Sequence, residues 1–150
     1  MAKARLIVYR HEGETAFLNV DVDVRSAKRL EPLVEALGGS VSLHYIGRQG
    51  TTYWAHFAPY SPMSADAAVL EIARLIRRLP RPARRLWDGA RERVFDIGIQ
   101  GGYRPHSSEH LLSTEALEQV TQLGGTLKIT IYGADAGGTS IKARGRPRER

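Results

Sequence analysis

The chain contains one unit twice, a helix closed by Leu-Gly-Gly and followed by a strand, at residues 30–47 and 116–133. The copies align at a constant offset of 86 residues, and each follows an alternating strand. Glycine ends helices readily because it adopts the left-handed conformation without steric strain, so we expect the glycines at 38, 39, 124 and 125 to be helix caps and not ligand cradles. The repeat predicts two β-α-β units, and chance reuse of a common helix-cap-strand arrangement stays open as the alternative.

Periodicity and capping residues place the other elements. The predicted strands are 5–10, 15–24, 41–46, 51–58, 94–99 and 126–132. The predicted helices are 27–37 after a Ser26 cap, one from Ser64 to Leu79, a short one from Pro82 to about Arg91, and one after Ser113. A polar loop is expected at 101–112.

From the second strand onward the order begins β-α-β-β-α-β, which is the order of a ferredoxin-like split β-α-β sandwich. We therefore predict an α+β fold with internal duplication, in which a mostly antiparallel sheet carries its helices on one face. Residues 1–133 are expected to form a single domain, with repeat units at about 16–47 and 93–133, and residues 134–150 a flexible basic tail.

Composition excludes several classes of protein. The chain has no cysteine, which excludes a disulfide framework, a thiol nucleophile and a zinc knuckle. No apolar run approaches the roughly 20 residues of a membrane span, and the apolar stretch near the N-terminus is too short for a signal peptide. We therefore expect a cytoplasmic bacterial protein with no membrane partner.

The net charge of +6 is concentrated in two places. Residues 74–93 carry eight arginines against two acids, and residues 142–150 carry five basic side chains against one acid, so the rest of the chain is mildly acidic. The basic residues that could contact nucleic acid are Arg74, Arg77, Arg78 and Arg81 on one helix stretch and Arg144 and Arg146 in an AT-hook-like Arg-Gly-Arg-Pro. The alternative is a solvated helix face and a solvated tail, and we favour it.

Several motif matches carry no catalytic prediction. His106 and His110 match the H-x-x-E-H spacing of inverted zincins, but the segment follows Pro105 and is expected in a loop, whereas zincin histidines share one helical face. The Gly-rich segments lack the lysine and the strand–loop–helix context of a phosphate loop. We expect no catalytic residue, metal or cofactor.

The face of the sheet away from the helices is the predicted binding surface. If helices cover the side of Val20, Val22, Leu43, Phe57, Ile97 and Ile129, alternation exposes Asn19, Asp21, Asp23, Ser42, His44, Thr52, Trp54, His56, Asp96, Gln100, Lys128 and Thr130. Among these, the candidate interaction residues are Asp21, Asp23, His44, Trp54 and His56, because exposed aromatic side chains concentrate at binding surfaces. One alternative is that an extra helix or loop 101–112 covers Trp54. Others are a hard cation bound by Asp21, Asp23 and Asp96, and a hydrolase that uses His44 and His56 with Asp21 or Asp23.

Four features in order carry a family resemblance. They are the Leu-Gly-Gly close of the first helix, Gly50 before a strand bearing Trp54, an apolar helix ending Leu-Ile-Arg-Arg-Leu-Pro, and the closing Leu-Ser-Thr-Glu-Ala-Leu with Leu-Gly-Gly-Thr-Leu-Lys-Ile-Thr-Ile-Tyr. Over residues 16–133 the chain resembles the bacterial domain of unknown function family 4279. It lacks the proline-containing segment expected after the first Leu-Gly. The resemblance implies no chemistry or catalytic residue, and only an association with toxin-immunity systems.

These observations favour a non-enzymatic interaction module that binds a protein partner or a second copy of itself. They rest on the lack of a nucleophile, base and orienting group at an interpretable spacing, and on an acidic, aromatic sheet face. The alternative function is a DNA-associated protein that uses the Arg-rich helix and the tail.

Overall fold

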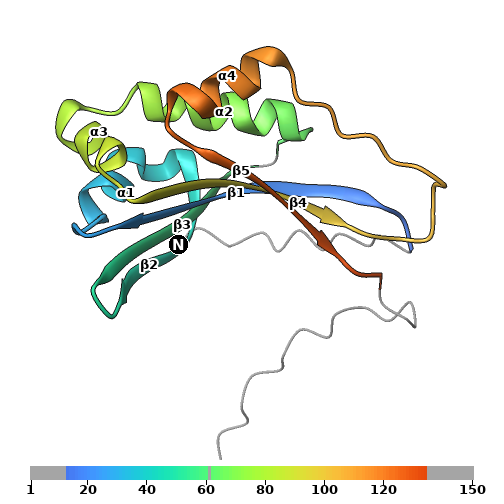
Figure 1. Ribbon diagram of the computed structural model, residues 1–150, viewed down its shortest axis with the longest axis horizontal. Coiled ribbons are helices and arrows are strands. Elements are labelled where there is room, and N and C mark those ends of the chain that lie inside the picture. Colours follow the sequence, from blue (N-terminus) through green and yellow to red (C-terminus); the bar gives the residue numbers. More distant parts are fainter. Residues whose placement is uncertain (1–12, 61, 135–150) are drawn as a thin grey trace, which may run out of the picture.

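A computed structural model describes residues 13–60 and 62–134, and Figure 1 shows its helices stacked on one side of a sheet. The elements in chain order are β1 (Ala16–Ser26), α1 (Glu31–Leu37), a 3-10 turn (Gly38–Ser40), β2 (Val41–Gln49), β3 (Thr52–Pro59), α2 (Ala65–Arg77), α3 (Arg81–Asp88), β4 (Glu92–Gln100), α4 (Thr114–Gln122) and β5 (Thr126–Tyr132). The strand predicted at 5–10 and the basic tail from residue 135 lie outside the described residues.

The strands form one mixed sheet in the order β2-β3-β1-β4-β5. The pairs β2–β3, β3–β1 and β1–β4 are antiparallel, whereas β4 and β5 are parallel. The repeated units therefore differ in topology, because β3 separates the strands of the first unit while those of the second are neighbours. The described residues have an α+β fold with one five-stranded sheet and four α-helices. The internal duplication stays a prediction.

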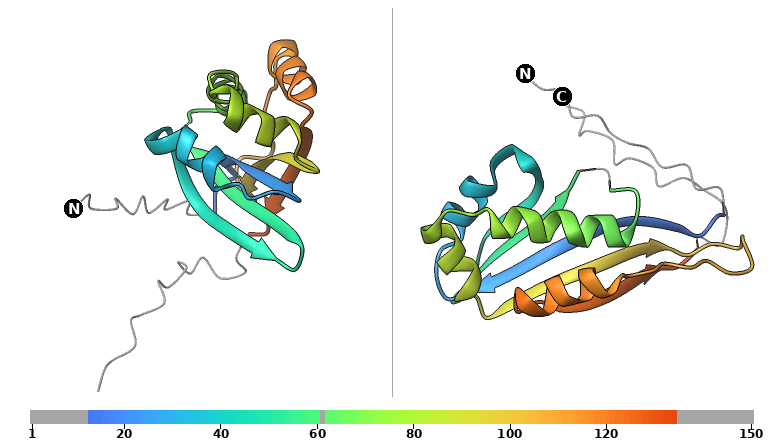
Figure 2. Two further views of the ribbon diagram at one scale, coloured as in Figure 1. Left: turned by 90° about the vertical axis from the view of Figure 1, so that its left-hand side faces the viewer. Right: turned by 90° about the horizontal axis from the view of Figure 1, so that it is seen from above.

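The core lies between the sheet and the helices. Alternate residues Val20, Val22 and Val24 of β1 are fully buried, as the period-2 pattern predicts. The central helix α2 packs against β1, β3 and α4, and Figure 2 shows α2 and α4 lying side by side along the sheet. The opposite face carries none of the described helices.

The capping predictions had mixed outcomes. The hydroxyl of Ser64 accepts a hydrogen bond from the backbone of Ala67 and so caps α2, and Ser113 caps α4 in the same way. The predicted cap at Ser26 is wrong. Ser26 is the buried last residue of β1, its hydroxyl accepts a hydrogen bond from the amide of Lys28, and α1 begins only at Glu31.

The two Leu-Gly-Gly triplets agree at their first glycine only. Gly38 and Gly124 have positive φ values of 55° and 67°, which glycine adopts without steric strain. The ψ of Gly38 is −138°, outside the left-handed helical region, so the predicted left-handed helix end is not found at Gly38. Gly39 and Gly125 do not have a positive φ. The amide of Gly125 nevertheless donates to the carbonyl of Val120 at 2.8 Å, so Gly125 contributes to the end of α4. A Cβ on Gly125 would lie 2.6 Å from Phe95 Cε2, whereas one on Gly39 would meet nothing within 4 Å. Gly125 therefore serves close packing.

Two residues expected under the helices are exposed. Leu43 is 43% and Ile129 59% accessible to solvent. Both lie on edge strands, β2 and β5, where a side chain has a neighbouring strand on one side only. Residues of the central strands, such as Phe57 and Ile97, are buried as expected.

Candidate functional site

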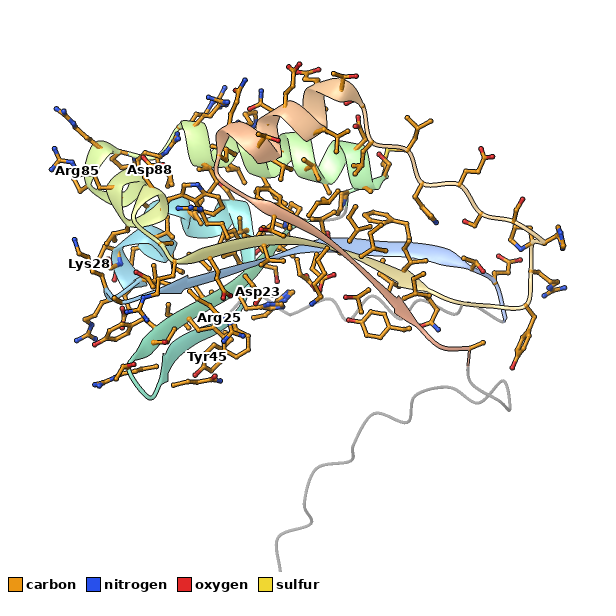
Figure 3. All side chains as sticks on the ribbon, in the orientation of Figure 1. Asp23, Arg25, Lys28, Tyr45, Arg85 and Asp88 are labelled. Carbon is orange, nitrogen blue, oxygen red and sulfur yellow. The ribbon has the colours of Figure 1, made fainter. Side chains whose placement is uncertain are left out.

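The open face of the sheet brings together all five residues predicted to form the interaction surface. Figure 3 shows Asp23, Arg25 and Tyr45 on the side of the sheet away from the helices. Pairing of β1 with β3 sets Asp23 opposite His56 and Arg25 opposite Trp54. We call this face, centred on β1, β2 and β3, the open face.

Asp23 joins two strands through one carboxylate oxygen. Its Oδ1 accepts a hydrogen bond from Trp54 Nε1 at 2.7 Å and lies 2.7 Å from Nδ1 of His56. Trp54 and His56 are two residues apart on β3 and point to the same face. The shared carboxylate therefore fixes the orientation of both rings.

Asp21, His44 and His56 form a second cluster beside it. One carboxylate oxygen of Asp21 lies 3.8 Å from His44 Nδ1 and the other lies 3.8 Å from His56 Nε2. Their ligating atoms all lie within 4.8 Å of one another, and the two imidazole rings are 5.1 Å apart between centroids. The three residues come from three strands, and their arrangement could hold a metal ion.

Burial raises the pKa of Asp21 above its ordinary value, against the opposing effect of the two histidines. The native state then binds more protons than the unfolded chain between the two pKa values. Folding stability therefore falls as pH rises from about 3.8 through the pKa of the folded state. The Asp21 carboxylate is a destabilising charge at neutral pH.

An aromatic group adjoins these clusters. The ring of Tyr45 lies 4.7 Å from that of Trp54, and the guanidinium of Arg25 lies 5.1 Å from the Trp54 ring centroid, within the range of a cation–π interaction. Trp54 is partly buried, by these neighbours. Loop 101–112, which joins β4 to α4, lies at the opposite end of the sheet from the β2–β3 hairpin (Figure 1) and so does not provide the cover considered from the sequence.

Sequence reasoning missed Tyr45 because β2 contains a bulge. The register changes between Leu43, which faces Phe57, and Tyr45, which faces His56. The extra residue brings both His44 and Tyr45 to the open face, whereas neighbours in a regular strand point to opposite faces. No signal in the residues between 41 and 49 marks the position of this bulge.

A third aspartate of the open face is already compensated. Lys128 Nζ lies 2.7 Å from Asp96 Oδ2, and the hydroxyl of Thr130 donates to Asp96 Oδ1 at 2.7 Å. Asp21 has no cation this close among the contacts of residues 13–60 and 62–134. The uncompensated charge of the open face therefore lies at the Asp21 end.

The predicted nucleic-acid residues lie elsewhere. All four arginines of the helix stretch are exposed: Arg74 and Arg77 on α2, Arg78 at its C-cap and Arg81 at the start of α3. Arg74 forms an ion pair with Glu71, and Arg77 donates to the side chains of Gln119 and Gln122 on α4, each at 2.6 Å. These contacts are typical of a solvated helix face. Arg144 and Arg146 lie outside the described residues.

The segment that matches the zincin spacing is not helical. Residues 106–110 lie in the loop before α4, and the hydroxyl of Ser108 lies 3.0 Å from His110 Nε2. His106 and His110 therefore do not share a helical face. This confirms the prediction from the sequence that the segment lies in a loop.

No helix in the described part of the chain is long and apolar enough to cross a membrane. A scan against protein-family models finds no matching family, and searches of curated proteins and of solved structures find no match to this chain.

Proposed function

We propose that this chain is a non-enzymatic protein-interaction module, and that it binds a partner protein through the open face. The observation that carries the proposal is the Asp23–Trp54–His56 cluster, held rigid by two 2.7 Å contacts on a face that no described helix covers. The non-enzymatic part of the proposal rests on the lack of a recognisable set of nucleophile, base and orienting group in the sequence.

Rigidity matters because association must overcome the ordering of side chains at the interface. Each immobilised side chain costs about 0.5–1.5 kcal/mol, and the side chains of Trp54 and His56 are already fixed through Asp23. Trp and Tyr are also enriched in the buried centres of interfaces. Tyr45 and Trp54 together supply such a centre.

Charge favours a basic partner surface. Asp21, Asp23 and Asp96 lie on the open face, and Lys128 is engaged by Asp96. Arg25 is partly engaged through Glu92, at 3.6 Å. A partner that presents lysine or arginine beside an apolar side chain would complement Asp21 and the Tyr45–Trp54 pair.

The test uses the full chain as bait in lysate of its native cell, followed by purification of the captured protein. We expect a partner, or a second copy of the chain, that binds at a fixed stoichiometry in calorimetry. Trp54→Ala should weaken that binding at least tenfold, because truncation removes an interface anchor.

Met63→Ala is the matched control, because Met63 is 96% exposed and lies just before α2 on the helix side. It should leave partner binding unchanged. A monomer that captures nothing, or a partner that binds the Trp54 variant as well as the parent chain, would contradict the proposal.

We further propose a ferredoxin-like unit within the α+β fold. Its support is the order β1-α1-β2-β3-α2-β4 together with the sheet order β2-β3-β1-β4, to which α3, α4 and β5 are additions. The internal duplication and membership of the domain of unknown function family 4279 rest on the motifs of the sequence. An immunity-type role in the bacterial cytoplasm follows from that membership, and an adjacent toxin gene would support it.

The alternative function is DNA association through the helix arginines and the tail. Its support is the charge of residues 74–93 and 142–150. Titration with duplex DNA at two salt concentrations, with and without residues 142–150, tests it, since binding through phosphates weakens steeply with salt. Absence of salt-sensitive binding would end this alternative.

A further inference from the structure

The cluster of Asp21, His44 and His56 has the spacing of ligands that surround one ion. The two Asp21–histidine separations of 3.8 Å exceed hydrogen-bond length. A tetrahedral zinc ion with bonds of about 2.0–2.2 Å holds its ligand atoms roughly 3.4 Å apart. Small side-chain rotations that move the ligating atoms by about 1 Å would therefore place all three around a common centre.

His56 is oriented as metal-binding histidines are. Its Nδ1 lies 2.7 Å from the Asp23 carboxylate, which accepts a hydrogen bond, so the proton sits on Nδ1 in the neutral ring. The lone pair of Nε2 then points towards Asp21. A carboxylate that holds the far nitrogen of the ring is the usual outer partner of a metal-bound histidine, and Trp54 Nε1 fixes that carboxylate in turn.

The electrostatics of the cluster favour a cation. A carboxylate oxygen of Asp21 and Nε2 of His56 lie 3.8 Å apart. If His56 is neutral with its proton on Nδ1, these two electron-rich atoms repel unless a positive charge lies between them. Asp23, on the same strand two residues from Asp21, and Asp96, which pairs with Asp21 in the β1–β4 register, add negative charge nearby. A divalent ion would compensate this charge.

The cluster also leaves room for a further ligand. Side-chain exposures of 30% for Asp21, 40% for His44 and 24% for His56 place it at the surface of the open face. A site with three protein ligands and one open position can take water or a group from a partner. Two imidazoles and one carboxylate suit Zn²⁺, Ni²⁺, Co²⁺ or Fe²⁺ better than Ca²⁺ or Mg²⁺, which prefer oxygen ligands.

We propose that Asp21, His44 and His56 form a binding site for one divalent transition-metal ion, with Asp23 as the outer partner of His56. Strand alternation predicts that these three residues share a face, but no spacing along the sequence marks them as ligands of one ion, because they belong to three strands. The site shares His56 and Asp23 with the cluster that carries the proposed function, but metal binding and partner binding are measured separately.

The test is a calorimetric titration of the untagged full chain with ZnCl₂ at neutral pH. We expect one ion per chain. His44→Ala and Asp21→Asn should weaken binding at least tenfold, and Asp23→Asn, which leaves all three ligands in place, roughly 10–100-fold. His110→Ala, which changes an exposed histidine of the loop before α4, should leave the affinity unchanged.

A second measurement needs no variant. In long-range ¹H–¹⁵N spectra of the parent chain, Zn²⁺ should shift the ring nitrogens of His44 and His56 and leave those of His11, His106 and His110 in place. No zinc binding, an affinity indifferent to His44→Ala, or shifts confined to the other histidines would overturn the proposal. If zinc does not bind but the partner still binds in the presence of a chelator, the metal site fails while the proposed function stands.

Discussion

Replacement of Gly125 by alanine tests the packing argument for the second Leu-Gly-Gly triplet. A Cβ at this position would lie 2.6 Å from Phe95 Cε2, 2.9 Å from Phe95 Cδ2 and 3.1 Å from Val120 Cγ1. Ordinary contact begins at 3.4 Å. The phenyl ring or the backbone of residue 125 must therefore move by about 0.8 Å, the difference between these two distances.

The ring has little freedom to move. Phe95 is fully buried and packs edge-on against Trp87, with ring centroids 6.2 Å apart. Gly125 is held in turn, because its amide donates to the carbonyl of Val120 at 2.8 Å. Inserting one methyl group into such a core destabilises a protein by about 1–3 kcal/mol.

Thermal unfolding followed by circular dichroism measures the effect. A loss of about 2 kcal/mol lowers the Tm of a domain of this size by roughly 4–8 °C. The matched control is Gly39→Ala, at the equivalent position of the first triplet, where the Cβ meets nothing within 4 Å. That change should be neutral or stabilise by up to about 1 kcal/mol. Equal effects at the two positions, or a neutral Gly125→Ala, would refute the argument.

Three further predictions concern single side chains. Trp87→Phe removes the indole hydrogen bond to the carbonyl of Leu123, 3.0 Å long and buried, and should lower the free energy of unfolding by about 1–3 kcal/mol in urea titrations; a change below about 0.5 kcal/mol would contradict it. Ser113→Ala removes the cap of α4 and should cost about 1 kcal/mol, restored in large part by aspartate or threonine at that position. Asp21→Asn should raise stability at neutral pH and flatten the decline in stability above pH 3.8, and unchanged pH profiles of Tm would exclude the destabilising charge.

Local patterns predicted most of the helices and strands because they reflect burial directly. The alternation of Val20, Val22 and Val24 marks β1, and the serines at 64 and 113 mark two helix starts. The same reasoning failed at Ser26, because a serine that accepts a backbone amide is compatible with a turn as well as a helix start. Here the hydroxyl of Ser26 bonds Lys28 at the end of β1.

Strand adjacency is a property of the whole sheet. The two Leu-Gly-Gly units have the same local pattern, but only in the second are the two strands neighbours. In the first unit β3 lies between β1 and β2 because the hairpin returns into that gap. No feature within either unit distinguishes the two outcomes, so the mixed sheet follows only once all five strands are placed together.

The candidate site shows the same division between local and global information. Period-2 alternation correctly placed Asp21, Asp23, Trp54 and His56 on one face, because β1 and β3 are regular where they pair. On β2 the alternation fails at the bulge, where Leu43 and Tyr45 face consecutive residues of β3.

The bulge determines what the open face can do. In a regular β2, either His44 would join the imidazole of His56 or Tyr45 would join the indole of Trp54, since adjacent side chains point to opposite faces. The extra residue allows both contacts, at 5.1 Å and 4.7 Å between ring centroids. The proposed metal ligands and the proposed aromatic anchor therefore share one structural cause. Deleting His44, the residue without a partner in the register, should abolish the metal site and leave the contact between Tyr45 and Trp54, because a regular β2 keeps only one of the two side chains on the open face.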